Sequence, residues 1–582
     1  MNESRRIILG WLVIAALFCQ GTVSQPPGGN KNAEANGNQG DSRQEPCDQL
    51  LEVPGKANGL QKRCEGDGTG GGAARGDFNG DNIADLAVGV PFEDQDGVNA
   101  VGGVNIIYGS PTGLTSTSDQ FLDETDFGFG YASNDHFGWA LASGNFNGDE
   151  FSDLAIGIPD RDSTGLANTG RVVLIDGSLS GLLLSTAREL DVTGGGTTGG
   201  RIGAALVWAD FNDDGFGDLA VGAPNAEIFA LFCTTRDAGA VHVFYGSETG
   251  LRQFGRQTIS QRPCGTTIGD AAESGDRFGF SLAAGDFDGD GGADLVVGIP
   301  GEDLGLFDKV DAGKIFFYRG FDDTGLSIVN PRQELSQDTP GVGGGAETGD
   351  QFGMALATGD FNGDGRADLA VGIPFEDLLD NTASDGGAIQ VFLAPNDNIL
   401  GDLVDAAGDI FISQSNLPNV SVESGDRFGW ALAVGKFDGD SFTDLAVGAP
   451  GENIGTVADA GIVHVLYGTA SGPSTTRVQL WQQDTANVPD ISEGGDQFGF
   501  ALSSWNYGKS DHADLAIGAP FEDLVSTSTG TLQLDAGAAT VIYGSAGGLA
   551  ATAASPAQLW TQDSSGINDT AQPDDNFGRV LY

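Results

Sequence analysis

Basic residues are scarce in this chain. Its 582 residues include 27 Lys and Arg against 82 Asp and Glu, which gives a formal net charge of -55 at pH 7. Recognition of nucleic acid depends on Lys and Arg side chains that neutralise phosphates, so this balance excludes a nucleic-acid partner. We attribute the acidity to solubility, with a specific cationic partner or cation sequestration as alternatives.

Catalytic signatures are missing as well. The sequence contains no Gly-x-Ser-x-Gly elbow, phosphate loop or His-Glu-x-x-His motif. His242 and His464 occupy the same place in two copies of one strand, which indicates a repeat-related surface position rather than catalysis. Glu-Asp pairs recur in register after a Pro, which indicates a turn of the fold rather than a catalytic dyad. These pairs are Glu93-Asp94, Glu302-Asp303, Glu376-Asp377 and Glu522-Asp523. We therefore predict a protein that is not an enzyme.

The N-terminus carries a short apolar run, and nothing resembling a membrane anchor follows it. Residues 1–24 place two Arg before the run from Ile7 to Phe18, followed by small residues, which is typical of an export signal. The run is too short to span a bilayer. We predict a secreted protein, extracellular or in the periplasm or at the cell surface, with no transmembrane anchor. The general secretory and twin-arginine routes both remain open.

Cysteine is rare, and removal of the signal leaves an even number. The remaining residues are Cys47, Cys64, Cys233 and Cys264. In an exported chain they predict disulfides, and the sequence-local pairing of Cys47 with Cys64 and Cys233 with Cys264 is favoured among three connectivities. Residues 25–68 are rich in Gly, Asn, Gln and Pro and predict a disordered spacer that contains the small Cys47-Cys64 loop.

Glycine and acidic turns are abundant instead. The segment from Asp360 to Asp368 reads Asp-Phe-Asn-Gly-Asp-Gly-Arg-Ala-Asp, with oxygen-bearing side chains at positions 1, 3, 5 and 9. Ca²⁺ takes about six to eight oxygen ligands, and side chains spaced in this way around a Gly bend supply them. Versions of the same segment begin at Asp77, Asn145, Asp210, Asp286, Lys436 and Asn506. Seven copies at a spacing of about 70 residues indicate a stacked or circular array.

Each unit carries the signals of four strands. An apolar stretch, which opens with Phe-Gly in five units, precedes the acidic loop, and a strand such as Asp368-Leu-Ala-Val-Gly-Ile-Pro374 follows it. A third, alternating stretch such as Gly461 to Gly468 has the period of a half-buried strand, and a less regular fourth stretch follows. Four strands in each of seven units predict an all-β, seven-bladed β-propeller with antiparallel strands over residues 69–582.

These motifs resemble the FG-GAP repeat of the integrin α-chain N-terminal propeller and its bacterial relatives. The name joins Phe-Gly to Gly-Ala-Pro, and this sequence carries Gly222-Ala-Pro224, Gly448-Ala-Pro450 and Gly518-Ala-Pro520, with Gly-Ile-Pro or Gly-Val-Pro in the other units. The resemblance implies calcium loops between the first two strands of particular blades and a role in adhesion or scaffolding.

The resemblance also implies which residues would bind the metal. Ligands would come from the side chains at positions 1, 3, 5 and 9 and from the backbone carbonyl at position 7. Five loops match in full, with side chains Asp77, Asn79, Asp81 and Asp85; Asn145, Asn147, Asp149 and Asp153; Asp210, Asn212, Asp214 and Asp218; Asp286, Asp288, Asp290 and Asp294; Asp360, Asn362, Asp364 and Asp368. The carbonyls would belong to Ile83, Phe151, Phe216, Gly292 and Arg366.

The loops differ in their expected affinity. Asn145 supplies an oxygen without a charge, so its loop should bind more weakly than the loop at Asp286. The sixth loop has Lys436 at position 1 ahead of Asp438, Asp440 and Asp444. Its ammonium removes one ligand and can itself satisfy the carboxylates, so metal at this loop stays open. The seventh, at Asn506, has lost too many carboxylates. We expect about five Ca²⁺ ions with a structural role.

These features favour an exported calcium-binding propeller that acts as an adhesion or protein- or carbohydrate-binding module. The alternative is an extracellular enzyme or carbohydrate-processing protein on the same scaffold, because a fold does not determine its function. That alternative predicts a pocket in which unrelated side chains from different blades converge outside the repeat pattern. The final residues, Phe577 to Tyr582, begin another Phe-Gly strand. This strand either closes the ring against the first blade or starts an eighth unit. The ligand and the oligomeric state are not predicted.

Overall fold

A computed structural model describes residues 76–582, apart from residues 164, 191, 193–198, 231–232, 254, 263–270, 306–308, 322–323, 328–330, 332, 379–382, 396–401 and 526–529. All described residues belong to one unit, Leu50–Tyr582. The export signal, the spacer, Cys47, Cys64 and Cys264 lie outside the described residues, as does the side chain of Cys233. The signal and the disulfides therefore stay predictions.

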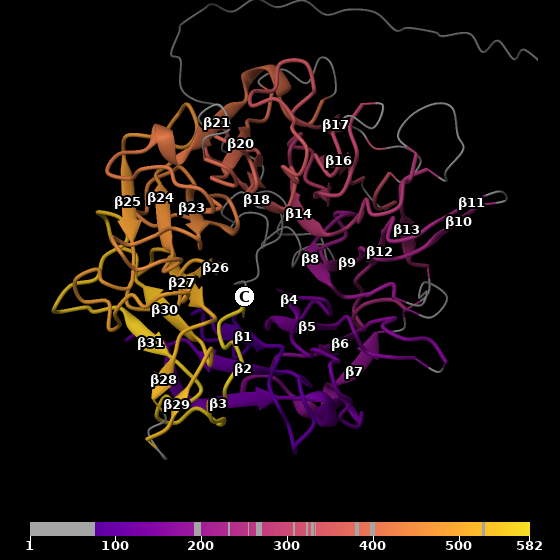
Figure 1. The fold of residues 1–582 in the computed structure, drawn as a ribbon. Helices are drawn as coiled ribbons and strands as arrows, with labels where there is room; N and C mark the ends of the chain where they lie inside the picture. The colour runs from indigo at the N-terminus through magenta and orange to yellow at the C-terminus, as the bar shows by residue number, and fades with distance from the viewer. Residues whose placement is uncertain are drawn as a thin grey trace, which may run out of the picture. The chain divides into compact units, whose positions relative to one another are not determined.

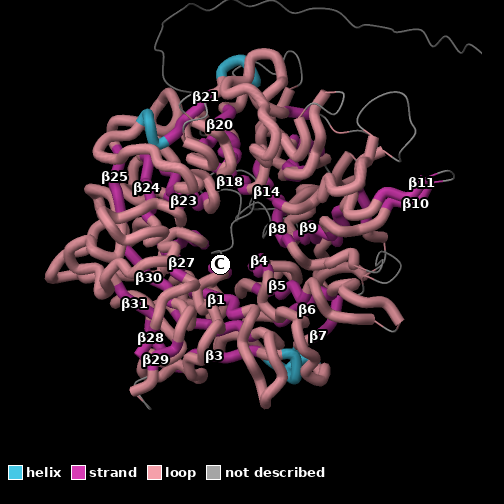
Figure 2. The backbone as a smooth tube through the Cα atoms, viewed as in Figure 1, coloured by secondary structure: helices cyan, strands magenta, loops and turns pink. Residues whose placement is uncertain are grey.

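The described strands form seven four-stranded antiparallel sheets, which follow one another around a ring (Figure 1). Turns and loops connect them, and the helical segments among the described residues are short 3₁₀ turns (Figure 2). These turns are η1 (Glu124–Phe127), η2 (Leu184–Thr186), η3 (Ala406–Gly408) and η4 (Gln414–Asn416). The predicted all-β, seven-bladed propeller is confirmed. No helix of the described residues is long and apolar enough to cross a bilayer.

Each blade runs from an inner strand near the ring centre to an outer strand at the rim (Figure 1). In this order, blade 1 contains β32 (Val580–Leu581), β1 (Leu86–Val90), β2 (Gly103–Tyr108) and β3 (Thr115–Leu122). Blade 2 contains β4 (Ala140–Gly144), β5 (Asp153–Ile158), β6 (Arg171–Ile175) and β7 (Arg188–Leu190). Blade 3 contains β8 (Ala205–Ala209), β9 (Asp218–Ala223), β12 (Ala240–Phe244) and β13 (Gln257–Ile259). Blade 4 contains β14 (Ser281–Gly285), β15 (Asp294–Ile299), β16 (Lys314–Tyr318) and β17 (Gln333–Leu335).

The remaining three blades have the same order. Blade 5 contains β18 (Ala355–Gly359), β19 (Asp368–Ile373), β20 (Ala388–Phe392) and β21 (Ile410–Ser413). Blade 6 contains β22 (Leu432–Gly435), β23 (Asp444–Ala449), β24 (Ile462–Leu466) and β25 (Val478–Trp481). Blade 7 contains β26 (Ala501–Trp505), β27 (Asp514–Ala519), β30 (Ala538–Ile542) and β31 (Gln558–Trp560). Two hairpins leave this pattern: β10 (Ile228–Ala230) with β11 (Cys233–Thr235), and β28 (Leu524–Val525) with β29 (Leu532–Gln533).

The second strand of every blade is buried along its whole length, because neighbouring blades cover both of its faces. Glycine allows this close stacking. A Cβ atom on Gly372 of β19 would lie 2.1 Å from the carbonyl oxygen of Gly429 in the next blade. The N–H of Gly429 in turn donates to the carbonyl of Gly448 at 3.1 Å. The Gly of Phe-Gly and the Gly of Gly-Ala-Pro are therefore the places where adjacent backbones meet.

The C-terminal strand completes the first blade. Leu581 and Val580 of β32 pair antiparallel with Val88 and Gly89 of β1, and the C-terminus lies near the centre of the ring (Figure 1). Ring closure, one of the two interpretations of this segment, is confirmed. The junction that closes the ring has the same contacts as the other junctions. The Tyr543 hydroxyl of blade 7 accepts the N–H of Leu114 in blade 1 at 3.1 Å. In the same way, the Tyr467 hydroxyl of blade 6 accepts the N–H of Leu549 in blade 7 at 3.1 Å.

Candidate functional site

The two ends of each blade carry different chemistry. The acidic loops join the first strand of a blade to the second, as between β18 and β19. Adjacent strands are antiparallel, so the Phe-Gly that precedes the first strand and the Pro that follows the second lie together at the opposite end. We call these ends the loop end and the Phe-Gly end.

The Asp at position 9 is a structural residue in all seven loops. It is completely buried in each of them. Asp294 Oδ2 accepts the N–H of Phe287 at 3.1 Å, and its Oδ1 accepts the N–H of Gly320 at 2.9 Å. Asp514 in the seventh loop accepts the N–H of Tyr507 and of Gly544, both at 2.8 Å. The equivalents in the other loops are Asp85, Asp153, Asp218, Asp368 and Asp444. A carboxylate oxygen with one donor keeps a second lone pair, so these groups remain able to bind a metal.

The Asp at position 1 folds the turn itself. Asp286 Oδ1 accepts the N–H of Gly289 at 2.7 Å, and its Oδ2 accepts the N–H of Gly291 at 2.9 Å. Asp77, Asp210 and Asp360 bond their own loops in the same way. At Asn145 only the side-chain oxygen can accept, and its Nδ2 donates to the carbonyl of Asp149. Such Asx turns form from sequence alone, so the loops are shaped in advance of any ion.

Position 5 ties the loop to position 7 in every complete loop. The carboxylates of Asp81, Asp149, Asp214, Asp290 and Asp364 accept the N–H groups of Ile83, Phe151, Phe216, Gly292 and Arg366 at 2.8–3.1 Å. These N–H groups belong to the residues whose carbonyls are predicted ligands. The structure thus brings positions 5 and 7 of each complete loop together.

Two loops gather three carboxylates each, and these are the two loops with Asp at position 3. Oxygens of Asp286, Asp288 and Asp294 lie within 4.8 Å of one another, and those of Asp438, Asp440 and Asp444 do the same. A Ca²⁺ ion bound at about 2.3–2.6 Å can contact oxygens up to about 5 Å apart, so both sets fit it. Position 3 is Asn in the other four complete loops. Their oxygen donors suit Ca²⁺ too, with one charge fewer than the loop at Asp286 in three of them and two fewer in the loop at Asn145.

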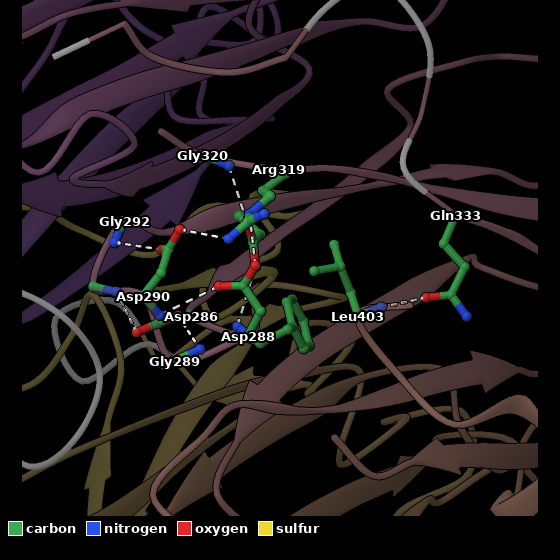
Figure 3. A network of polar contacts seen from close by, with 12 residues as sticks. Asp286, Asp288, Gly289, Asp290, Gly292, Arg319, Gly320, Gln333 and Leu403 are labelled. Carbon is green, nitrogen blue, oxygen red and sulfur yellow. Dashed lines mark hydrogen bonds and ion pairs between the residues drawn. The ribbon is translucent and has the colours of Figure 1, made fainter. Parts of the chain in front are cut away.

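An arginine binds the position-3 carboxylate in both of these loops. Arg319 Nε lies 2.6 Å from Asp288 Oδ2, and its Nη2 lies 2.8 Å from Asp290 (Figure 3). Arg477 lies 2.6 Å from Asp438 in the sixth loop. Burial raises the pKa of Asp288, as does the neighbouring Asp290, while Arg319 lowers it. A cation from outside the loop therefore offsets the extra negative charge.

A strip of aromatic side chains crosses the Phe-Gly end of five blades. Its members follow either the Phe-Gly or the Pro of their repeats, and we define it as Phe375, Trp430, Phe500, Phe521, Phe92 and Trp139. Ring centroids of Trp430 and Phe500 lie 5.3 Å apart. Arg579 links the halves of the strip, since its guanidinium lies 4.9 Å from the ring centroid of Phe500 and 5.0 Å from that of Phe92. All seven residues are half-buried.

A polar pocket of about 610 Å³ lies at the same end, where blades 2 and 3 meet. His136 Nδ1 and Arg201 Nη2 both lie 2.8 Å from Asp160 Oδ2. Burial raises the pKa of Asp160, but the bonds from His136 and Arg201 lower it by more, so the net shift is downward. Asp160 directly follows the Pro of its repeat. In most other repeats the residue at this place is Phe or Gly. Such a pocket, outside the repeat pattern, is what an enzyme on this scaffold is predicted to have.

Two expectations about recurring residues have different outcomes. His242 and His464 are buried, with 2% and 1% exposure, so their interpretation as surface positions is wrong. Their strands, β12 and β24, are covered on both faces by adjacent blades, and period-two alternation does not mark an exposed face there. The Glu-Asp pairs are confirmed as turn features, because their Asp side chains accept backbone N–H groups, as Asp377 does from Asp385 at 3.0 Å.

A family model for the FG-GAP repeat matches residues 69–106, 137–175, 202–244, 278–318, 352–392 and 428–466. These repeats and the seven-bladed ring define an FG-GAP repeat β-propeller. The chain belongs to the FG-GAP repeat proteins, with a propeller like that of integrin α-chains. The unit that begins at Phe498 lies outside these matched segments, and its acidic loop is the one that has lost most carboxylates.

The curated relatives match over limited segments. Phosphatidylinositol-glycan-specific phospholipase D of Bos taurus is 38% identical over 168 residues, 28% of this chain and 18% of that protein. Integrin alpha-PS2 of Drosophila melanogaster is 31% identical over 230 residues, 38% and 14% of the two chains. Integrin alpha-V of Gallus gallus is 30% identical over 240 residues, 40% and 20%. The chain thus spans a minor part of each relative. The phospholipase D among these relatives is named as an enzyme, whereas the integrins are not. Similarity to these proteins therefore does not decide between a binding module and an enzyme.

Solved structures give a weak likeness. A Bacillus licheniformis rhamnogalacturonan lyase aligns over 86% of this chain and 76% of its own, with 10% identity and a TM-score of 0.33. A likeness this low supports no conclusion about function.

Sequence reasoning missed the arginines at the loops and the pocket at Asp160. Arg319 lies 29 residues beyond Asp290, and only the fold brings the two together. The pocket did leave a signal, because Asp160 departs from the residue types that follow Pro in most other repeats.

Proposed function

We propose that this protein is an exported calcium-binding propeller that acts as an adhesion or protein- or carbohydrate-binding module. The observation that carries the proposal is the separation of the two ends of the ring. Acidic loops lie at one end and a half-buried aromatic strip lies at the other. Metal binding and partner binding would then use different surfaces.

Calcium at the loop end is supported by the donor set. Carboxylate, amide and carbonyl oxygens are hard ligands, and the loops hold them in turns that form without the ion. The five complete loops would bind Ca²⁺, and the carboxylates of Asp438, Asp440 and Asp444 favour the sixth despite Lys436. A bound ion would neutralise clustered carboxylates and so stabilise the blade.

Partner binding at the Phe-Gly end is supported by residue type. Aromatic side chains and Arg are enriched in protein interfaces and supply much of their binding energy. Trp430, Phe500 and Arg579 meet this description and leave part of each side chain accessible. Such a strip also presents flat apolar surface to the apolar face of a sugar ring.

Capture of extracellular material tests the partner proposal. Immobilised full chain should retain less material when Trp430→Ala and Phe500→Ala are combined. The matched control is Leu179→Ala, which removes an apolar side chain of 85% exposure at the loop end. Equal capture by the strip variant, with an unchanged melting temperature, would refute the proposed surface.

A second candidate function rests on the pocket at Asp160. An aspartate that orients a histidine through Nδ1 is a common arrangement for proton transfer, and Arg201 from the next blade could hold an anionic group. This geometry supports an extracellular enzyme or carbohydrate-processing activity. His136→Gln should abolish any turnover found in a screen of extracellular polysaccharides and esters, whereas His512→Gln should retain it. Turnover that survives His136→Gln would exclude this pocket as its source.

A further inference from the structure

Every blade junction brings three equivalent positions together. One lies one or two residues past the fourth strand, as Gln414 and Gln483 do. The next blade supplies the others: one residue two positions after the Pro, such as Glu522, and one two positions before the Phe of Phe-Gly, such as Asp496. The backbone confirms the equivalence of the Glu522 position, because its N–H donates to Ala519 and its carbonyl accepts from Gly537 at 2.9 Å. Matching bonds occur in all seven blades.

Five junctions carry Gln, Glu and Asp at these positions. In four of them the Gln Nε2 donates to the Glu Oε2 at 2.6–2.7 Å, as from Gln483 to Glu522. The Gln and Glu side chains are buried, with at most 7% exposure. The five sets are Gln562, Glu93 and Asp575; Gln261, Glu302 and Asp276; Gln337, Glu376 and Asp350; Gln414, Glu452 and Asp426; Gln483, Glu522 and Asp496.

The other two junctions show what these positions require. Between blades 1 and 2 the Gln is replaced by Glu124 and the Glu by Arg161, and the two lie 2.7 Å apart. Arg161 also pairs with Asp135. Between blades 2 and 3 the positions hold the apolar residues Val192 and Ala226, which pack in one cluster, and the Asp is Gly200. Each of these junctions therefore either pairs its charges or has none.

Each Gln-Glu-Asp junction contains two carboxyl groups and a neutral amide, so its three side chains include no positive charge to offset the negative ones. Lys314 Nζ lies 3.6 Å from Glu302 and offsets one charge at that junction. The junctions of Glu93, Glu376, Glu452 and Glu522 use another solution. A pair of adjacent buried carboxylates is costly, and such a pair lowers the cost by keeping one proton.

The carboxyl groups of two junctions indicate where a proton would be held. The carboxyl groups of Glu93 and Asp575 are close enough to interact directly, as are those of Glu452 and Asp426. A hydrogen bond between two carboxyl groups would need a proton on one of them. In the described structure, Asp575 Oδ1 and Asp426 Oδ1 meet no N–H or O–H donor. A proton on the Glu would supply the donor that these buried oxygens lack.

We propose that the junctions of Glu93, Glu376, Glu452 and Glu522 each bind one proton, shared between the Glu and the neighbouring Asp, and that the ring is weakened when these protons leave. The junction of Glu93 and Asp575 joins the last blade to the first, so it acts directly on ring closure. The charged groups facing Glu522 are Asp490, Glu493 and Asp496, all acidic, beside the amide of Gln483.

The expected pH dependence follows from these surroundings. Burial raises the pKa of Glu522 from its ordinary value of 4.5 to about 9, helped by Asp490 and Asp496 and opposed by the bond from Gln483. Burial likewise raises the pKa of Glu376 to about 8. At a pH between the ordinary pKa of 4.5 and the raised pKa of each Glu, the folded chain keeps a proton that the unfolded chain has released. The unfolding equilibrium should therefore shift toward the unfolded state by about tenfold per pH unit for each such proton.

The test compares the full chain with Glu522→Gln across about pH 5.5 to 9 at saturating calcium and again in chelator. The Gln amide stands in for a permanently protonated Glu. The slope of unfolding free energy against pH should become less steep by the contribution of one bound proton. The variant should have a higher melting temperature than the wild type at about pH 9. The infrared band of protonated carboxyl groups should weaken in the variant at neutral pH. Glu248→Gln, at an exposed Glu, should change neither quantity.

An unchanged slope, or a loss of stability that is equal at every pH, would overturn the proposal. If Glu522→Gln fails to fold, the junction can be given the set already present between blades 2 and 3, namely Gln483→Val, Glu522→Ala and Asp496→Gly. This variant should lose the same proton from the slope, and retention of the wild-type slope would also overturn the proposal.

Discussion

The loop at Asp286 and the loop at Asn506 occupy the same place in two blades and differ at three of four ligand positions. The first has Asp at positions 1, 3 and 5, and the second has Asn, Gly and Ser. Both keep a completely buried Asp at position 9 that accepts two backbone N–H groups. The comparison separates two roles that a single acidic motif conceals. Position 9 holds the blade together, whereas positions 1, 3 and 5 would distinguish a metal site from a turn.

The largest expected effect is at Asp514, in the loop that should bind no metal. Asp514→Ala leaves the N–H groups of Tyr507 and Gly544 buried without an acceptor. We expect a loss of about 3 kcal/mol or more, measured by urea unfolding and equal with and without calcium. Asp511→Ala, at an exposed position of the same loop, is the control. A loss smaller than that of the control would refute a structural role for position 9.

Removing the side chain at position 1 should reduce the part of the stability that depends on calcium. With calcium at about 100 times its Kd, one filled site adds about 2.7 kcal/mol to the free energy of unfolding. Asp286→Ala should remove about that much of the calcium-dependent increase. Asn506→Ala should leave the increase intact. Because Asp286 also bonds its own turn, the comparison is between melting with calcium and melting in chelator for each variant. Equal calcium responses in all three proteins would contradict the assignment.

The repeat pattern made the fold predictable, because Phe-Gly, the acidic turn and the Gly of Gly-Ala-Pro are local signals. Ring closure by Val580 and Leu581 was one of two interpretations, and the pairing with β1 decided between them. The surface placement of His464 was wrong, because burial in a propeller comes from the neighbouring blade. Contacts such as that of Gln483 with Glu522 span 39 residues and two blades, so no local pattern contains them. The same holds for Arg319 and its loop.

Arg319 sharpens the comparison of the loops with a smaller effect. Arg319→Met removes the cation beside Asp288 and Asp290, so the ion-free protein should lose about 1 kcal/mol. Calcium should bind more tightly, because no cation competes for these carboxylates. Calorimetric titration measures the second effect. Arg252→Met is the control, since Arg252 is more exposed and lies 3.7 Å from Asp214. Weaker calcium binding in Arg319→Met would mean that the arginine shapes the site rather than competing for it.

The buried histidines should oppose the acidic junctions in their pH dependence. Burial lowers the pKa of His464 from its ordinary value of 6.5 to about 3. The unfolded chain therefore takes up a proton below about pH 6.5 that the folded chain refuses, and stability falls as pH falls. At about pH 5.5 this costs about 1 kcal/mol relative to pH 7. His464→Gln should remove that loss from the melting profile, whereas His512→Gln should leave it unchanged. If both variants keep the wild-type profile on the acid side, the low-pH loss must come from carboxylates that are paired in the folded ring.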